Sequence, residues 1–154
     1  MLIFLDIDGV MVPAASWKSP QILEDGFPAF SSRAVSVLRT LISAKDTVML
    51  TTSHKSTYSI SEWIDIFERR GIKIDNLQCL ESNTHNLTRK DEIMRWVNVN
   101  CLEEDFVIID DDKSLNDLPR FLKEHLILTS SMIGLTNEHL QVIESILRPA
   151  PQLA

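Results

Sequence analysis

The sequence begins with Met1-Leu2-Ile3-Phe4-Leu5-Asp6-Ile7-Asp8-Gly9-Val10, in which five apolar residues lead directly into two aspartates and a glycine. An apolar run of this length that stops at a glycine is typical of a strand buried on both faces, as in a parallel sheet. Ligands of such sheets bind beyond the carboxyl ends of the strands, which is where Asp6 and Asp8 lie. The stretch therefore predicts an α/β fold with acidic groups at its ligand-binding edge.

The two carboxylates also indicate a chemistry. Asp6 and Asp8 would repel each other unless a cation neutralised them, and Mg²⁺ suits such oxygen ligands and accepts phosphate oxygens as well. One carboxylate can then act as a nucleophile while its neighbour transfers protons. The same pattern also opens turns and resembles the start of a calcium loop, but no glutamate follows at calcium-loop spacing. A catalytic site and a simple turn are thus the two interpretations that the rest of the chain must separate.

The composition is that of an ordinary globular domain. The chain has 154 residues, 44% hydrophobic and 24% charged, with a net charge of −7 and no long basic run that would indicate a nucleic-acid surface. We expect one domain over residues 1–148 and a C-terminal tail at 149–154. The apolar start is too short for a membrane span and lacks the basic flank of a signal peptide, so a cytoplasmic protein is expected. Cys79 and Cys101 are expected to be small buried thiols.

Strand and helix patterns alternate along the chain. Strands are predicted at 1–5, 47–51, 77–80, 106–109 and 126–128, and helices after Ser31 or Ser32, over 58–70, after Thr88, over 118–123, and from Thr136 to Leu147 before Pro149. Residues 11–30 read as a loop. Strands separated by such helices imply right-handed crossovers, and so a three-layer α/β/α, Rossmann-like parallel sheet.

Three of these strands end in polar clusters, which should meet at one edge of the sheet. The clusters are Asp6 with Asp8, Thr51 to Ser53, and Asp110 to Asp112. Together they meet the needs of phosphoryl transfer: a nucleophile, hydroxyl donors for phosphoryl oxygens, and anionic metal ligands. Arg89 or Lys90, at the start of a predicted helix, can supply the missing cation with help from the helix dipole.

With these residues in view, the chain resembles the haloacid dehalogenase-like (HAD) superfamily of hydrolases over residues 1 to about 130. The resemblance is carried by Leu5-Asp6-Ile7-Asp8-Gly9-Val10, Leu50-Thr51-Thr52, a basic residue at 89 or 90, and Ile109-Asp110-Asp111. It implies that Asp6 attacks phosphorus to form an aspartyl-phosphate, while Asp8 acts as general acid and then base. Aspartate at position 8 implies phosphate substrates rather than dehalogenation.

The resemblance also implies the ligands of Mg²⁺ and phosphate. Mg²⁺ would be held by the Asp6 carboxylate, the Asp8 backbone carbonyl and Asp111, with Asp110 as a further candidate. Thr52 is preferred to Thr51 as the phosphate-binding hydroxyl, because Ser53-His54-Lys55 resembles the segment that follows it in one HAD group. Lys90 is preferred to Arg89, because lysine is the usual residue of the family.

The spacing also bears on the substrate. Residues 11–30 and 71–87 are too short for the cap domain of larger HAD enzymes, so an open site is expected. Such a site suits a phosphate on a large molecule, such as a nucleic-acid end or a phosphoprotein, or an oligomer whose neighbour covers it. Trp17, Lys18, His54 and Lys55 are candidates for the rim that meets this substrate. The chain is similar to the HAD domain found in RNA-repair proteins, because it combines Asp6-Ile7-Asp8-Gly9-Val10, Thr52-Ser53-His54-Lys55 and Glu92-Ile93-Met94-Arg95-Trp96.

Three functions follow from this pattern. The first is a Mg²⁺-dependent phosphomonoesterase. The second is a HAD-fold regulatory protein that binds phosphate and metal without physiological turnover, although such a protein has no need of the acid at Asp8. The third, a receiver-like phosphoacceptor, would carry its paired acids and its nucleophile on different strands, unlike Asp6 and Asp8.

Overall fold

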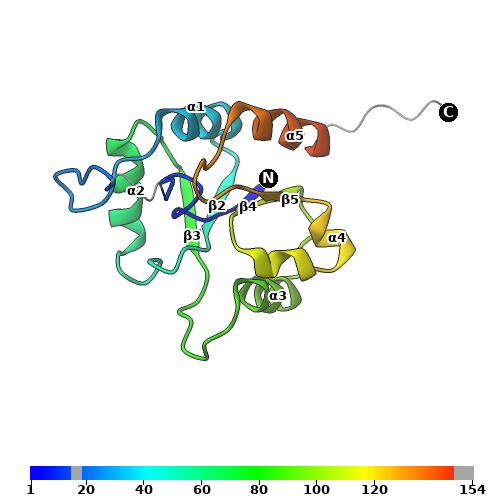
Figure 1. Cartoon of the computed structure of the whole chain (residues 1–154). Coiled ribbons are helices and arrows are strands. Elements are labelled where there is room, and N and C mark those ends of the chain that lie inside the picture. The colour runs from blue at the N-terminus through cyan, green and yellow to red at the C-terminus, as the bar shows by residue number, and fades with distance from the viewer. Residues whose placement is uncertain (15–18, 148–154) are drawn as a thin grey trace.

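Five parallel strands form one sheet in the computed structural model, which describes residues 1–14 and 19–147 (Figure 1). They are β1 (Leu2–Leu5), β2 (Thr47–Leu50), β3 (Asn76–Cys79), β4 (Phe106–Asp110) and β5 (Leu126–Leu128), in the order β3-β2-β1-β4-β5. Leu5 pairs with Leu50 on one side and with Ile109 on the other. Because these strands end level with one another, the segments that follow them start at one edge of the sheet.

Helices cover both faces of this sheet, which confirms the predicted three-layer fold. They are α1 (Ser32–Leu41), α2 (Ile60–Arg69), α3 (Arg89–Asn100), the 3₁₀ helix η1 (Lys113–Asp117), α4 (Arg120–Lys123) and α5 (Asn137–Leu147). Side chains alternate across β1: Ile3 and Leu5 join the core under α1, α2 and α5, whereas Leu2 and Phe4 join the core under α3 and α4. The first strand is therefore apolar at every position because both its faces are buried.

Side-chain caps start three of the α-helices. Ser31 caps α1 by accepting from the backbone N–H of Ala34, and Thr88 caps α3 by accepting from that of Asp91. A full capping box is present at α2, between Ser59 and Glu62. Each of these three helices thus begins at a polar residue in the loop that follows a strand.

The structure differs from the sequence prediction at a few positions. Residues 118–123 do not form one helix, because Pro119 has no N–H to continue it; η1 ends at Asp117 and α4 starts at Arg120. Cys79 is half-buried and Cys101 is exposed, so neither is a fully buried thiol. Cys101 ends α3 in a left-handed conformation (φ 50°), which places its side chain outside the core.

The connection from β1 to α1 carries a small flap. An antiparallel bridge between Ile22 and Pro28 closes it, so this loop is more ordered than expected from its sequence. Arg70, just after α2, binds the flap through Asp25 and through the carbonyls of Phe27 and Pro28. In the ranges that the structure describes, neither this segment nor residues 71–87 holds a cap domain.

Some predictions concern residues outside the described ranges. Trp17 and Lys18, proposed for the rim, are among them, as are Pro149 and the tail at 149–154. Among the described helices, none combines the length and the apolar character that crossing a lipid bilayer requires. The cytoplasmic location stays a prediction.

Candidate active site

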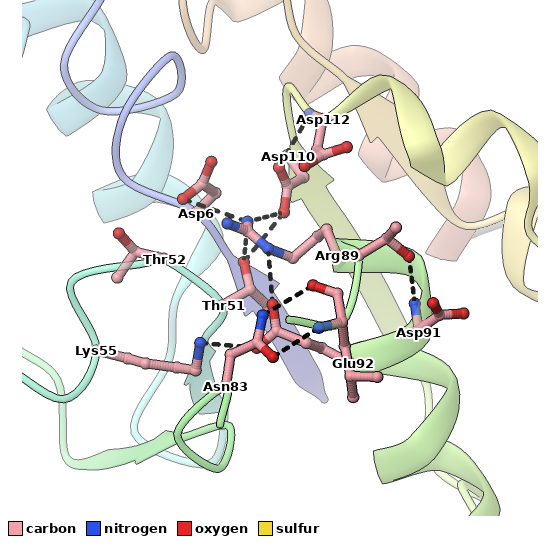
Figure 2. Close-up of polar contacts among 12 residues, drawn as sticks. Asp6, Thr51, Thr52, Lys55, Asn83, Arg89, Asp91, Glu92, Asp110 and Asp112 are labelled. Carbon is pink, nitrogen blue, oxygen red and sulfur yellow. Dashed lines mark hydrogen bonds and ion pairs between the residues drawn. The ribbon is translucent and has the colours of Figure 1, made fainter. Parts of the chain in front are cut away.

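The three polar strand ends meet at the carboxyl edge of the sheet, as predicted (Figure 2). The backbone N–H of Asp6 donates to the carbonyl of Ile109 (3.0 Å), and that of Thr51 donates to the carbonyl of Leu5 (2.9 Å). Asp6 is 5% exposed, and Thr51 and Asp110 are fully buried. Strand register alone therefore places a nucleophile candidate beside a hydroxyl and a second acid.

The segment after Asp6 forms a tight turn that is also part of this acidic site. The backbone N–H groups of Met11 and Val12 both donate to the carbonyl of Ile7 (2.8 and 3.0 Å). Gly9 adopts φ +78°, and a Cβ atom at this position would overlap the Asp111 carboxylate. The turn and the site interpretations of Asp-x-Asp-Gly are thus compatible, because the turn places a glycine where the Asp111 carboxylate packs against the backbone.

Thr129, directly after β5, also binds this turn. Its hydroxyl donates to the carbonyl of Gly9 (2.8 Å), and its backbone N–H donates to the carbonyl of Asp110 (2.9 Å). One residue thereby links the acidic ends of β1 and β4. Thr129 could not be recognised from the sequence, since a single threonine after a short strand has no signal of its own.

Asp8 lies in a different environment from Asp6. Its side chain is 56% exposed, and its Oδ2 lies 2.8 Å from Nε2 of His54, in the loop after β2. His54 is itself about half exposed, in keeping with the predicted position at the rim of the site. Two aspartates one residue apart are thus separated into a buried and an exposed carboxylate.

Arg89, and not the preferred Lys90, is the basic residue that reaches the acidic cluster. Nη1 of Arg89 lies 2.7 Å from Oδ2 of Asp110, 3.4 Å from Oδ1 of Asp6 and 3.2 Å from Oγ1 of Thr51. Successive residues of a helix point about 100° apart, so only one of the pair can face the cluster. Among the described residues, the side chain of Lys90 makes no contact with the cluster, and its backbone N–H donates to Oγ of Ser114.

Lys55 does not lie on the rim, contrary to the sequence prediction. Its side chain is 3% exposed, and its Nζ lies 2.7 Å from Oε2 of Glu92, whose side chain is 8% exposed. Oε1 of Glu92 lies 3.6 Å from Nε of Arg89. The carboxylate of Glu92 thus stands between two buried cations (Figure 2).

The two threonines differ in how their hydroxyls are used. Thr51 donates to Oδ2 of Asp110 (3.1 Å) and accepts from Arg89, so its hydroxyl is engaged within the site. Oγ1 of Thr52 accepts from the backbone N–H of His54 (3.3 Å), and its own proton has no acceptor among the described residues. This arrangement agrees with the preference for Thr52 as the donor to phosphate, which stays a prediction.

The acidic residues form a group that fits a divalent metal. Asp6, Asp110 and Asp111 each place one carboxylate oxygen within 4.8 Å of the others. Burial and the charge of Asp110 raise the pKa of Asp6 from 3.8 to about 9, although Arg89 opposes them. Burial also raises the pKa of Asp111. Such crowding of buried carboxylates is relieved by a hard cation, for which their oxygens are suitable ligands.

Within this group, Asp110 differs from the other two. Its Oδ2 is held by Arg89 and Thr51, and its Oδ1 accepts from the backbone N–H of Asp112 (3.1 Å). Among the described residues, fewer hydrogen bonds engage the carboxylates of Asp6 and Asp111, so these two are the better candidates for Mg²⁺ ligands. The Asp8 carboxylate lies outside the group, which is compatible with the expectation that only its backbone carbonyl binds metal.

Comparison with known proteins adds one finding. The family model described as the HAD domain in Swiss Army Knife RNA repair proteins matches residues 2–140. Searches of curated proteins and of solved structures found no match. The matched range contains every residue of the acidic site described above.

Proposed function

We propose, on the premise that this chain belongs to the family of HAD domains in Swiss Army Knife RNA repair proteins, that it hydrolyses phosphate monoesters in a Mg²⁺-dependent reaction. Membership of this family makes it a HAD-type hydrolase domain. The observation that supports the finer assignment is the separation of the two aspartates: Asp6 is buried beside Arg89, whereas Asp8 is exposed beside His54. Environments that differ in this way suit a nucleophile and a proton-transfer group.

In the proposed first step, Asp6 attacks the phosphorus atom of the substrate. A bond forms between the carboxylate oxygen and phosphorus, the bond to the leaving oxygen breaks, and Asp8 gives its proton to that oxygen. Arg89 and the Thr52 hydroxyl donate to the phosphoryl oxygens as negative charge builds up on them. Bound Mg²⁺, held by Asp6 and Asp111, would neutralise the carboxylates and hold one phosphoryl oxygen.

In the second step, water releases phosphate from Asp6. The Asp8 carboxylate, now without its proton, accepts one from a water molecule as that water attacks phosphorus. The acyl-phosphate bond breaks, and Asp6 returns as a carboxylate while Asp8 is again protonated. Exposure of Asp8 supports this role, because the leaving group and the water must both reach it.

The substrate we propose is a phosphate at a nucleic-acid end. The support is the name of the matched family, together with the absence of a cap domain in the described residues. A site without a cap admits a phosphate carried by a large molecule. The net charge of −7 does not conflict with this, because a terminal phosphate needs only a small positive rim. The same open edge would also admit a phosphoprotein. It would equally allow a second subunit to cover the site.

A substrate panel tests this function. It comprises p-nitrophenyl phosphate, phosphorylated metabolites, nucleotides, and RNA and DNA oligonucleotides with a 5′- or 3′-phosphate, each with Mg²⁺ and with EDTA. We expect Mg²⁺-dependent release of phosphate, highest for an oligonucleotide end, and its loss in Asp6→Asn. Binding of phosphate without turnover of any member would instead favour the regulatory protein. Equal rates in the wild type and in Asp6→Asn would exclude Asp6 as the nucleophile.

A further inference from the structure

We propose that Glu92 is a positioning residue of this site, which holds the guanidinium of Arg89 toward the place of the phosphoryl group. The inference rests on the proposed function, because it concerns how the same site binds phosphate. Within the described part of the chain, Glu92 contacts none of the candidate metal ligands, Asp6 included. It acts through Arg89, which lies beside both Glu92 and Asp6.

The position of Glu92 in α3 brings it to Arg89. The two residues are three apart in the first turn of the helix, so their side chains lie on one face. Glu92 is also a residue in the first turn, where a negative charge is favoured by the helix dipole. The helix itself therefore favours a carboxylate at this position.

The contact between Glu92 and Arg89 orients the guanidinium without occupying its terminal nitrogens. Oε1 of Glu92 is 3.6 Å from Nε of Arg89, which is too long for a hydrogen bond, and that Nε is buried without a hydrogen-bond partner. Nη1 is bonded to Asp110 and Thr51. In the described part of the chain Nη2 has no hydrogen bond, so this nitrogen is available to a phosphate oxygen.

The contact with Lys55 gives Glu92 a second effect. Its Oε2 makes an ion pair with Nζ at 2.7 Å, although without hydrogen-bond geometry. The charge of a buried lysine has to be paired, because removal of its partner leaves an uncompensated charge in a poorly solvated place. Glu92 thus compensates the charge of Lys55 while it also faces Arg89.

Binding of inorganic phosphate in the presence of Mg²⁺ tests this inference without turnover. In calorimetric titrations, we expect Glu92→Gln to weaken phosphate binding about tenfold, the order expected for one misplaced charge-assisted contact. Glu124→Gln is the matched control, because Glu124 forms an exposed ion pair with Arg120 far along the chain from the site. In steady-state assays, KM should rise by the same factor for an aryl and an alkyl phosphate, since Asp8 is unchanged.

A double-mutant cycle separates positioning from a general loss of structure. If Glu92 acts through Arg89, then Arg89→Ala with Glu92→Gln should bind phosphate no more weakly than Arg89→Ala alone. Additive losses would overturn the proposal, as would wild-type phosphate affinity in Glu92→Gln. If the single variant unfolds, Lys55→Met with Glu92→Gln removes the unpaired charge and should restore the melting temperature while phosphate affinity stays low. Recovery of both would show that Glu92 serves only as the partner of Lys55.

The outcomes also separate this inference from the proposed function. Failure of the wild type to release phosphate from any substrate counts against the phosphatase, whereas the binding cycle still decides the role of Glu92. A wild-type protein that binds no phosphate with Mg²⁺ would overturn the inference as well.

Discussion

Nε2 of His54 lies 2.8 Å from Oδ2 of Asp8, and this contact joins the exposed aspartate of the first motif to the loop after β2. His54 also meets the edge of the Phe27 ring in the flap, with the ring centroids 6.2 Å apart. The carboxylate proposed to transfer protons is therefore not a freely rotating surface group. Its orientation depends on an imidazole that the rest of the fold holds in place.

The first prediction concerns the leaving group. In the proposed mechanism Asp8 protonates the departing oxygen, so loss of its orienting partner in His54→Ala should matter most for poor leaving groups. We expect kcat/KM for an alkyl phosphate to fall about tenfold, whereas that for p-nitrophenyl phosphate changes little. Asp8→Asn should show the same preference with a larger loss, about 10²-fold or more. Steady-state kinetics on the two substrates measure both effects.

His85→Ala is the control for this experiment, because His85 is exposed in the loop after β3 and makes no contact with Asp8 among the described residues. Equal losses on both substrates in His54→Ala would contradict an effect that passes through Asp8. They would indicate that His54 contacts the phosphate or the body of the substrate instead.

The second prediction concerns the pH dependence of stability in the metal-free protein. The pKa of Asp6 is raised from 3.8 to about 9, first by burial and then by the charge of Asp110. A raised folded-state pKa means that the protonated group stabilises the fold fully below about pH 4, and that this contribution declines as the pH rises toward about 9. In EDTA, stability should therefore fall over this range more steeply in the wild type than in Asp6→Asn.

Chemical unfolding at about pH 5 and about pH 8, in EDTA and in Mg²⁺, measures this difference. Mg²⁺ should remove the decline in the wild type, because the metal takes the place of the proton between the carboxylates. Asp75→Asn is the control, since Asp75 lies in an exposed and weak ion pair with Lys73. Parallel pH profiles for the wild type and Asp6→Asn would show that the pKa of Asp6 is not raised.

The third prediction uses two glycines with the same backbone conformation. Gly9 has φ +78° and Gly26 has φ +80°, so alanine meets a similar backbone cost at each, about 1 kcal/mol. A Cβ atom at Gly26 meets nothing within 4 Å, whereas one at Gly9 would overlap the Asp111 carboxylate. We expect Gly9→Ala to lose the stabilisation by Mg²⁺ as well as activity, and Gly26→Ala to lose only a little stability.

Thermal unfolding with and without Mg²⁺ provides the measurement for this pair. The difference between the two variants isolates the packing of Asp111 from the backbone cost of alanine. A Gly9→Ala protein that still gains the wild-type stabilisation from Mg²⁺ would argue against Asp111 as a metal ligand.

The fold was predictable because it depends on signals that are local in the sequence. Apolar runs such as those ending at Asp6 and Asp110 identify the central strands, and Ser31 and Thr88 mark helix starts. The meeting of the three polar strand ends followed from the parallel sheet alone. Each of these inferences needed only the order of the elements.

The details of the site were harder to predict because they depend on side-chain directions. Whether Arg89 or Lys90 faces the cluster is decided by the rotation of α3 against the sheet, which no motif records. Lys55 looks like a solvated turn residue until Glu92 is brought beside it from α3. Thr129 matters through its bonds to Asp110 and to Gly9, the latter a residue 120 positions away.

The last prediction concerns the flap and the residue that anchors it. The Arg70 side chain is 2% exposed and binds both oxygens of Asp25, at 2.6 and 2.9 Å. It also donates to the carbonyls of Phe27 and Pro28, and its guanidinium lies 5.6 Å from the Phe27 ring centroid. Lysine cannot reproduce this planar set of donors. Arg70→Lys should therefore destabilise the protein by about 3 kcal/mol, as expected when a buried pair loses its geometry.

The neighbouring arginine provides the control for this prediction. Arg69 pairs with Asp65 one helical turn away at the exposed surface, so Arg69→Lys should leave the free energy of unfolding nearly unchanged. The hydrogen bonds from Arg70 also hold the pKa of Asp25 below its usual range. This contribution to stability is present above about pH 4 and is lost as the pH falls through the lowered pKa.

Because Phe27 meets both Arg70 and His54, Arg70→Lys should reproduce part of the leaving-group effect of His54→Ala. Destabilisation without any change in that preference would mean that the flap does not orient His54.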